Sequence, residues 1–186
     1  VVSFEKTKDF FPETMRANII AAGNPVRRDV LSGDRGRGRD LLDFPVDKPI
    51  LLVSGGSQGA RSLNALVTEA LPVLLEKWNV VHQTGSSGGT LLELPGYRQI
   101  EYIGEEYGDI LAAADLVLCR SGATTLWELA AVRKASILVP LGLEASRGDQ
   151  LRNAELFARI GASFILGASE DAGVSGLLKL TGDLAD

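Results

Sequence analysis

The sequence has little cysteine and histidine and no long hydrophobic run. Cys119 is its one cysteine and has no second thiol with which to form an internal disulfide. His82 is its one histidine, and neither residue is accompanied by carboxylates at the spacing of a metal site. No stretch of about 20 apolar residues is present that would span a bilayer. These absences argue against a disulfide scaffold, favour a cytosolic setting and predict no metal site.

Positive charge is also scarce. The 186 residues include 19 lysines and arginines and 24 aspartates and glutamates, for a net charge of −5. This balance gives no general attraction to nucleic acid or to an anionic membrane surface. The 45% of hydrophobic and 23% of charged residues are typical of a soluble globular domain. Residues 1–11 are charged and lack the apolar segment of a secretory signal.

From residue 50 onward, short apolar runs alternate with helical patterns. The runs typical of buried strands are residues 50–53, 79–83, 99–103, 116–119, 137–139 and 163–166. Helical periodicity covers residues 63–75, 109–114, 125–132 and 149–160. Pro72 is expected to kink the first of these helices. The alternation predicts an α/β fold, a Rossmann-like doubly wound parallel sheet of about six strands.

Residues 32–40, which precede the first strand, are rich in glycine and charge and contain no apolar side chain. Segments of this composition have no hydrophobic face to bury. The arginines are typical of RNA-binding tracts, but the interspersed aspartates and the absence of aromatic residues argue against that role. We therefore expect a mobile surface loop.

A glycine-rich turn follows the first predicted strand. Residues 55–59 read Gly-Gly-Ser-Gln-Gly and precede an amphipathic helix. Glycine lets the backbone approach a ligand closely, and the N–H groups at a helix start favour an anion such as phosphate. The turn is not a dinucleotide fingerprint, because Ser54 replaces its first glycine and no acidic residue ends the second strand. It also lacks the Gly-Lys-Ser/Thr of a Walker loop.

Two later turns offer further polar groups. Residues 120–125 join the fourth strand to a helix, and Glu128 follows either as a ligand contact or as the partner of Thr125 in a capping box. Asp149 and Gln150 open a third helix and suit sugar hydroxyls, although Asp149 is alternatively an ordinary N-cap. Parallel strands present their carboxyl ends at one edge, so we expect the first two turns there.

The single histidine and cysteine carry less functional weight. A histidine in a strand is more often structural than a general base, since a base needs a substrate-facing position and a partner. We therefore interpret His82 as structural. Cys119 is typical of a small buried residue at a strand end.

Five segments taken together resemble the carboxyl-terminal half of the MurG-type glycosyltransferases of family 28, which add N-acetylglucosamine to lipid I in peptidoglycan synthesis. These segments are residues 23–27, 55–64, 82–85, 120–128 and 149–154. They follow the order of the family and cover nearly the whole chain. The resemblance implies a GT-B enzyme with two Rossmann-like domains, of which this chain is the donor-binding one. We expect a Gram-positive branch of the family.

The resemblance also implies which residues contact the donor, UDP-N-acetylglucosamine. Arg27 and the helix starts would neutralise the diphosphate without a metal, Glu128 would bind the ribose, and the backbone near Ile103 would bind uracil. Asp149 and Gln150 would contact the sugar hydroxyls. The implied set is Arg27, Ser57, Gln58, Gly59, Ile103, Ala123, Thr124, Thr125, Glu128, Asp149 and Gln150. No metal cofactor and no catalytic residue is expected within the chain.

The family has a second domain that binds the acceptor. We expect residues 1–20 to be the tail of that amino-terminal domain with an interdomain linker, and residues 21–186 to be a donor-binding domain truncated at its carboxyl end. The full-length enzyme would be an inverting hexosyltransferase, peripheral on the cytoplasmic face of the bacterial membrane. It would transfer N-acetylglucosamine to the C4 hydroxyl of lipid I to give lipid II. The chain alone would bind the donor without transferring it.

Alternatives remain. The chain is also compatible with another UDP-sugar enzyme of the GT-B architecture, with a UDP-N-acetylglucosamine 2-epimerase, or with a non-catalytic nucleotide-sugar-binding subunit. Many family members have histidine or glutamine where this chain has Asp149, which leaves the contacts to the sugar hydroxyls open.

Overall fold

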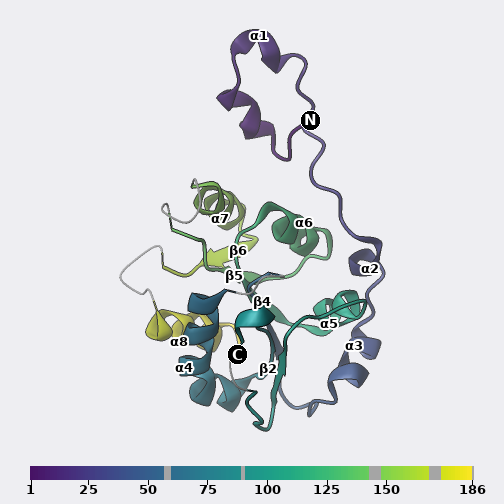
Figure 1. Cartoon of the computed structure of the whole chain (residues 1–186), viewed down its shortest axis with the longest axis vertical. Helices are drawn as coiled ribbons and strands as arrows, with labels where there is room; N and C mark the ends of the chain where they lie inside the picture. Colours follow the sequence, from purple (N-terminus) through teal and green to yellow (C-terminus); the bar gives the residue numbers. More distant parts are fainter. Residues whose placement is uncertain (57–59, 89–90, 143–147, 168–172, 186) are drawn as a thin grey trace.

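A computed structural model describes residues 1–56, 60–88, 91–142, 148–167 and 173–185. In this part of the chain six strands form one sheet in the order β3-β2-β1-β4-β5-β6, and every pairing is parallel (Figure 1). The strands are β1 (Ile50–Ser54), β2 (Asn79–Gln83), β3 (Tyr97–Ile100), β4 (Leu116–Cys119), β5 (Ser136–Leu138) and β6 (Ser163–Ile165). The strand order reverses between β1 and β4, the place where doubly wound sheets bind ligands. The predicted fold class is confirmed.

Helices cover both faces of this sheet. They are η1 (Glu5–Phe10), α1 (Glu13–Arg16), α2 (Arg28–Leu31), α3 (Arg35–Leu42), α4 (Arg61–Lys77), η2 (Gly85–Ser87), α5 (Tyr107–Ala113), α6 (Ala123–Ala131), α7 (Asp149–Arg159) and α8 (Val174–Asp183). Leu51 and Val53 face α4 and α8, whereas Ile50 and Leu52 face the helices of the opposite layer, α2, α3, α5, α6 and α7. Because both faces are covered, the strand is apolar at successive positions.

Most element boundaries agree with the sequence pattern to within two residues. The main exception is β3, which ends at Ile100, so that Ile103 lies in the loop before α5 and not at a strand end. The helix α4 continues through Pro72 as one element. The kink expected at this proline stays a prediction.

The prediction of a loop at residues 32–40 is wrong, because most of these residues form α3. The N-cap of the helix is Asp34, whose side chain accepts a hydrogen bond from the Arg37 N–H. The glycines serve close packing: a Cβ on Gly38 would lie 2.1 Å from the carbonyl oxygen of Asp109 in α5. Arg37 also donates to both carboxylate oxygens of Asp109, at 2.8 and 2.9 Å. Backbone proximity, ion pairs and the buried Leu42 at the end of α3 therefore order this segment.

The amino-terminal segment packs against α6 and α7. Val2 forms a parallel bridge with Ala21, and the ring of Phe4 stacks on Trp127 with 5.6 Å between centroids. Figure 1 shows α1 at the far end of this segment from the sheet. Among the described residues, no helix combines the length and the apolar character needed to cross a bilayer.

Candidate functional site

Three strands end in register at the centre of the sheet. Ser54 of β1 pairs with Gln83 of β2 on one side and with Cys119 of β4 on the other. The segments that follow these strands therefore begin side by side. Gly56, in the first of them, has a φ of +85°, a conformation that favours glycine. The prediction that the first two glycine turns share one edge is confirmed at these strand ends.

The guanidinium of Arg27 and the carboxylate of Glu128 meet beside this edge. Nε of Arg27 donates to Oε1 of Glu128 at 2.8 Å, and the Glu128 side chain is only 6% exposed. The guanidinium lies over the ring of Tyr107, 4.7 Å from its centroid, and Asp29 is 3.6 Å from Nη1. The hydrogen bond to Glu128 raises the pKa of Arg27, so its charge is fixed. The structure thus joins two predicted donor contacts that are far apart in the sequence.

The start of α6 is open to a ligand. Its N-cap is Gly122, which has no side chain to offer, and Ala123 is the first helical residue. Thr125 lies inside the first turn, so the capping-box reading of Thr125 and Glu128 is wrong. Glu128 instead turns toward Arg27. The first N–H groups of the helix therefore have no side-chain cap and present their partial positive charge at the sheet edge.

Gln83 links the first turn to the loop that carries Ile103. Its Nε2 donates to the carbonyl of Gly56 at 3.3 Å, and its Oε1 accepts from the N–H of Ile103 at 3.3 Å. Ile103 is 4% exposed, and its predicted backbone contact with the base stays a prediction. No role was predicted for Gln83 from the sequence. Its place at a strand end, next to the predicted anion turn, was the available signal.

The start of α7 is fastened to the second turn. The hydroxyl of Ser121 donates to the Gln150 carbonyl at 2.8 Å, and the amide of Asn153 donates to the Ser121 carbonyl at 3.1 Å. Oε1 of Gln150 accepts from the Leu141 N–H at 3.2 Å, and no bond of its amide nitrogen is seen among the described residues. Asp149 is exposed and is the first residue of the helix, whose N-cap is Gly148. Its alternative reading as an N-cap is therefore wrong.

Arg120 is a second residue that the sequence analysis missed. Its Nη1 donates to the Val139 carbonyl at 2.8 Å and its Nη2 to the Ser62 hydroxyl at 2.6 Å. It thereby connects the end of β5 to the first turn of α4. Desolvation lowers the pKa of Arg120, and no carboxylate pairs with it among the described residues. Its charge adds to the positive potential of this edge.

His82 and Cys119 lie behind the site. His82 is 1% exposed, and desolvation lowers its pKa to about 4, so the ring is neutral and unable to contact a substrate directly. Burial raises the pKa of Cys119 to about 12, so its thiol stays protonated. The structural interpretation of both residues is confirmed. In the described part of the chain, no three His, Cys, Asp or Glu side chains gather as metal ligands would.

Ser57, Gln58 and Gly59 fall outside the described residues. Gly56 and Ala60 border them, and Ala60 is the N-cap of α4 without a side-chain hydrogen bond. The predicted donor contacts of these three residues stay predictions.

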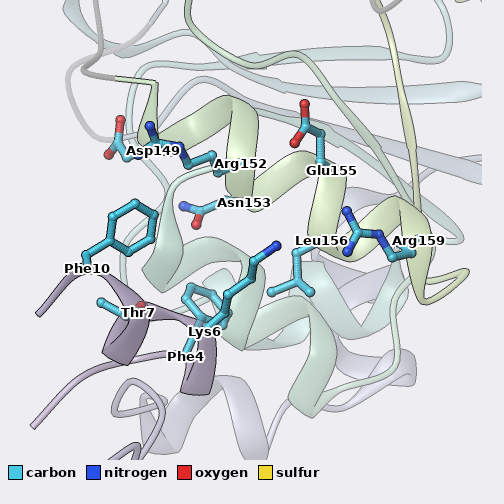
Figure 2. A pocket seen from close by; sticks show the side chains of 10 residues that line it. All are labelled: Phe4, Lys6, Thr7, Phe10, Asp149, Arg152, Asn153, Glu155, Leu156 and Arg159. Atoms are coloured by element: carbon cyan, nitrogen blue, oxygen red, sulfur yellow. The ribbon is translucent and has the colours of Figure 1, made fainter. Parts of the chain in front are cut away.

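A cavity of about 460 Å³ lies between the amino-terminal segment and α7 (Figure 2). Its wall combines aromatic and charged side chains from η1 and α7: Phe4, Lys6, Thr7, Phe10, Asp149, Arg152, Asn153, Glu155, Leu156 and Arg159. Arg152 lies over the ring of Phe10, 5.2 Å from its centroid. Asp149 and Asn153 connect this cavity to the start of α7, so it adjoins the predicted sugar contacts.

Residues 50–179 match the family model described as the glycosyltransferase family 28 C-terminal domain. The chain belongs to this family. The match begins with β1 and extends into α8, so it includes the sheet and every turn described above except the segment of Arg27.

Curated relatives extend the likeness to both ends of the chain. A Clostridium perfringens (strain SM101 / Type A) protein named UDP-N-acetylglucosamine--N-acetylmuramyl-(pentapeptide) pyrophosphoryl-undecaprenol N-acetylglucosamine transferase is 44% identical over 164 residues, which are 87% of this chain and 46% of that protein. A Bacillus cereus (strain ATCC 14579) protein with the same name and the suffix 2 is 40% identical over 186 residues, 99% of this chain and 52% of that protein. The family 28 chain thus spans about half the length of the curated relatives it matches.

Solved structures agree with this assignment. The crystal structure of Acinetobacter baumannii MurG matches with a TM-score of 0.63 and 27% identity, covering 94% of this chain and 52% of that one. The glycotransferase of kitacinnamycin matches with a TM-score of 0.62 at 20% identity, covering 88% of this chain and 40% of that one. The second likeness shows the fold alone.

Proposed function

We propose that this family 28 domain binds the donor UDP-N-acetylglucosamine in an enzyme that transfers N-acetylglucosamine to the C4 hydroxyl of lipid I, giving lipid II. The names of the relatives that match 87% and 99% of the chain support the reaction. The observation that carries the donor role is the contact of Arg27 with Glu128 beside the uncapped start of α6. A fixed cation on Arg27, the buried carboxylate of Glu128 and the uncapped N–H groups of α6 thus lie together.

Each of these groups suits a different part of the donor. The starts of α4 and α6 and the guanidinium of Arg27 suit the diphosphate, because N–H groups at a helix start and an arginine both donate to phosphate oxygens. One oxygen of Glu128 accepts from Arg27, and the carboxylate retains acceptor capacity for a ribose hydroxyl. The backbone at Ile103 suits the base, and Asp149 with the amide nitrogen of Gln150 suits the sugar.

Such a site favours departure of the diphosphate. In an inverting transfer the acceptor hydroxyl attacks the anomeric carbon while UDP leaves, so negative charge on the diphosphate increases in the transition state. Pre-oriented N–H groups and a fixed arginine stabilise this growing charge. We propose that they act without a metal ion. The acceptor, the catalytic base and the attachment to the membrane would belong to a further domain, and residues 1–20 would lead into the donor domain.

Substitution of Thr125 by glutamate tests the donor site. A carboxylate in the first turn of α6 would repel the diphosphate and compete for the same N–H groups. We expect Thr125→Glu to abolish UDP binding in calorimetry. Thr14→Glu makes the same change at an exposed position of α1 and serves as the control. Equal UDP affinity of the two variants would contradict the assignment.

A further inference from the structure

A chain of buried polar side chains connects α4, β2 and β3 behind the first turn. The Tyr97 hydroxyl lies 3.0 Å from Nδ1 of His82, and Nε2 of His82 lies 3.1 Å from Oδ1 of Asn64. Nδ2 of Asn64 donates to the Thr84 carbonyl at 2.9 Å. All four residues are at most 7% exposed. Neither the family assignment nor the donor contacts proposed above give these side chains a role.

The direction of each hydrogen bond follows from the last acceptor in the chain. The Thr84 carbonyl can only accept, so the amide nitrogen of Asn64 must face it, and Oδ1 of Asn64 must face His82. Oδ1 can only accept, so Nε2 of His82 must carry the ring proton. Nδ1 of the neutral ring then accepts from the Tyr97 hydroxyl. One arrangement of protons therefore satisfies every member, and each member depends on its neighbour.

This chain of hydrogen bonds ends where the diphosphate site begins. The N–H of Asn64 donates to the carbonyl of Ala60 at 2.8 Å, so Asn64 belongs to the first turn of α4. On the other side of residues 57–59 in the sequence, Gln83 donates to the carbonyl of Gly56. His82 and Gln83, neighbours in β2, thus bond to Asn64 and Gly56, which lie on either side of the segment that leads into α4.

We propose that Asn64, His82 and Tyr97 are positioning residues that hold the start of α4 in the orientation required by the diphosphate of a bound nucleotide. This role rests on the proposed function. A buried polar chain is costly unless every group is paired, so it stabilises one placement of α4 against the sheet more selectively than apolar packing does. The N–H groups at the start of α4 bind phosphate only when they point at it.

Nuclear magnetic resonance of the histidine ring tests the connection directly. His82 is the only histidine in the chain, so its two ring nitrogens give signals without overlap from another residue. In the 186-residue protein we expect a proton on Nε2 and none on Nδ1. Addition of UDP is expected to shift both ring signals along a saturation curve that gives the same Kd as calorimetry.

Four variants separate positioning from simple stability. Tyr97→Phe removes the donor to Nδ1, and His82→Leu removes the whole connection. His82→Gln supplies an amide N–H donor for Asn64 and an amide oxygen as acceptor for the Tyr97 hydroxyl, so it should restore binding. Ser136→Ala removes a hydroxyl from another buried pair, in which Ser136 and Ser163 lie 2.7 Å apart across β5 and β6.

The expected changes in UDP affinity differ among these variants. We expect Kd to rise by about 3- to 10-fold for Tyr97→Phe, which corresponds to about 0.6–1.4 kcal/mol, the size of one hydrogen bond, and at least as much for His82→Leu. His82→Gln and Ser136→Ala are expected to bind within about twofold of the original protein. If His82→Leu does not fold, as judged by circular dichroism, Tyr97→Phe and the ring titration decide.

Two results would overturn the proposal in different ways. Unchanged Kd in Tyr97→Phe and in folded His82→Leu, or ring signals that stay fixed while calorimetry records UDP binding, would remove the positioning role alone. Absence of UDP binding by the unsubstituted chain would remove the proposed function and this role with it.

Discussion

Arg27 and Glu128 lie 101 positions apart, yet Nε of Arg27 donates to the Glu128 carboxylate at 2.8 Å. The resemblance predicted both as donor contacts, but the local sequence left Glu128 divided between a ligand and a capping box. The structure excludes the capping box because α6 begins at Ala123, ahead of Thr125. A cap depends on the helix start to within one residue, and the sequence pattern does not define the start that closely.

Glu128→Gln tests the ribose contact. A hydrogen bond to a charged acceptor contributes about 1.5–3 kcal/mol of binding free energy, so its loss is expected to raise the Kd for UDP by about 10-fold or more. The original protein should prefer UDP to 2′-deoxy-UDP in calorimetry, and the variant should lose most of that preference. Glu105→Gln, at an exposed position, is the control and should retain it. An undiminished preference in Glu128→Gln would place the ribose elsewhere.

His82 makes stability depend on pH. Its pKa is lowered to about 4 in the folded protein against 6.5 for an ordinary histidine, so between these values the unfolded chain binds the extra proton. The free energy of unfolding is therefore undiminished by His82 above pH 6.5. It decreases as the pH falls toward 4, by up to roughly 3 kcal/mol.

Chemical denaturation at several pH values measures this dependence. His82→Gln carries no titrating group and should show a flatter profile between pH 6.5 and 5. Parallel profiles for the two proteins would contradict the burial of a neutral ring.

At the scale of elements, strands were predicted well and the segment of α3 was not. Runs such as Leu116–Cys119 are apolar because both faces of the sheet are covered, and that signal is local. In α3 the decisive contact is between Gly38 and the backbone of Asp109, 71 positions away by the numbering. Composition alone does not separate glycine that permits close packing from glycine that permits flexibility.

Gly38→Ala tests this packing. The added Cβ would lie 2.1 Å from the Asp109 carbonyl oxygen and 2.8 Å from Cβ of Ala113, both on α5. We expect a loss of about 1–3 kcal/mol in the free energy of unfolding, measured by urea denaturation, because the helices must separate. Gly36→Ala is the control in the same helix, since its Cβ meets only the Asp34 carboxylate, at 3.1 Å. Equal effects of the two substitutions would contradict close packing of α3 on α5.

At the scale of the whole molecule, the alternation of strands and helices predicted a doubly wound parallel sheet, and with it the edge where the first two turns lie. The linking roles of Gln83 and Arg120 could not, because their partners come from other strands and loops. A single side chain at a strand end gives no sign of which neighbouring loop it holds. The sequence therefore predicts where a nucleotide sugar would bind more completely than how the site is held together.

The measurement closest to the central claim is a calorimetric titration of the chain with UDP-N-acetylglucosamine, UDP-glucose and UDP-N-acetylgalactosamine in buffer containing EDTA. We expect saturable binding of all three without metal. The Kd for UDP-N-acetylglucosamine should be roughly 10-fold lower than the other two, the difference that one or two hydrogen bonds make. Equal affinities would limit the site to recognition of UDP. Absence of binding by all three would contradict the donor-binding role.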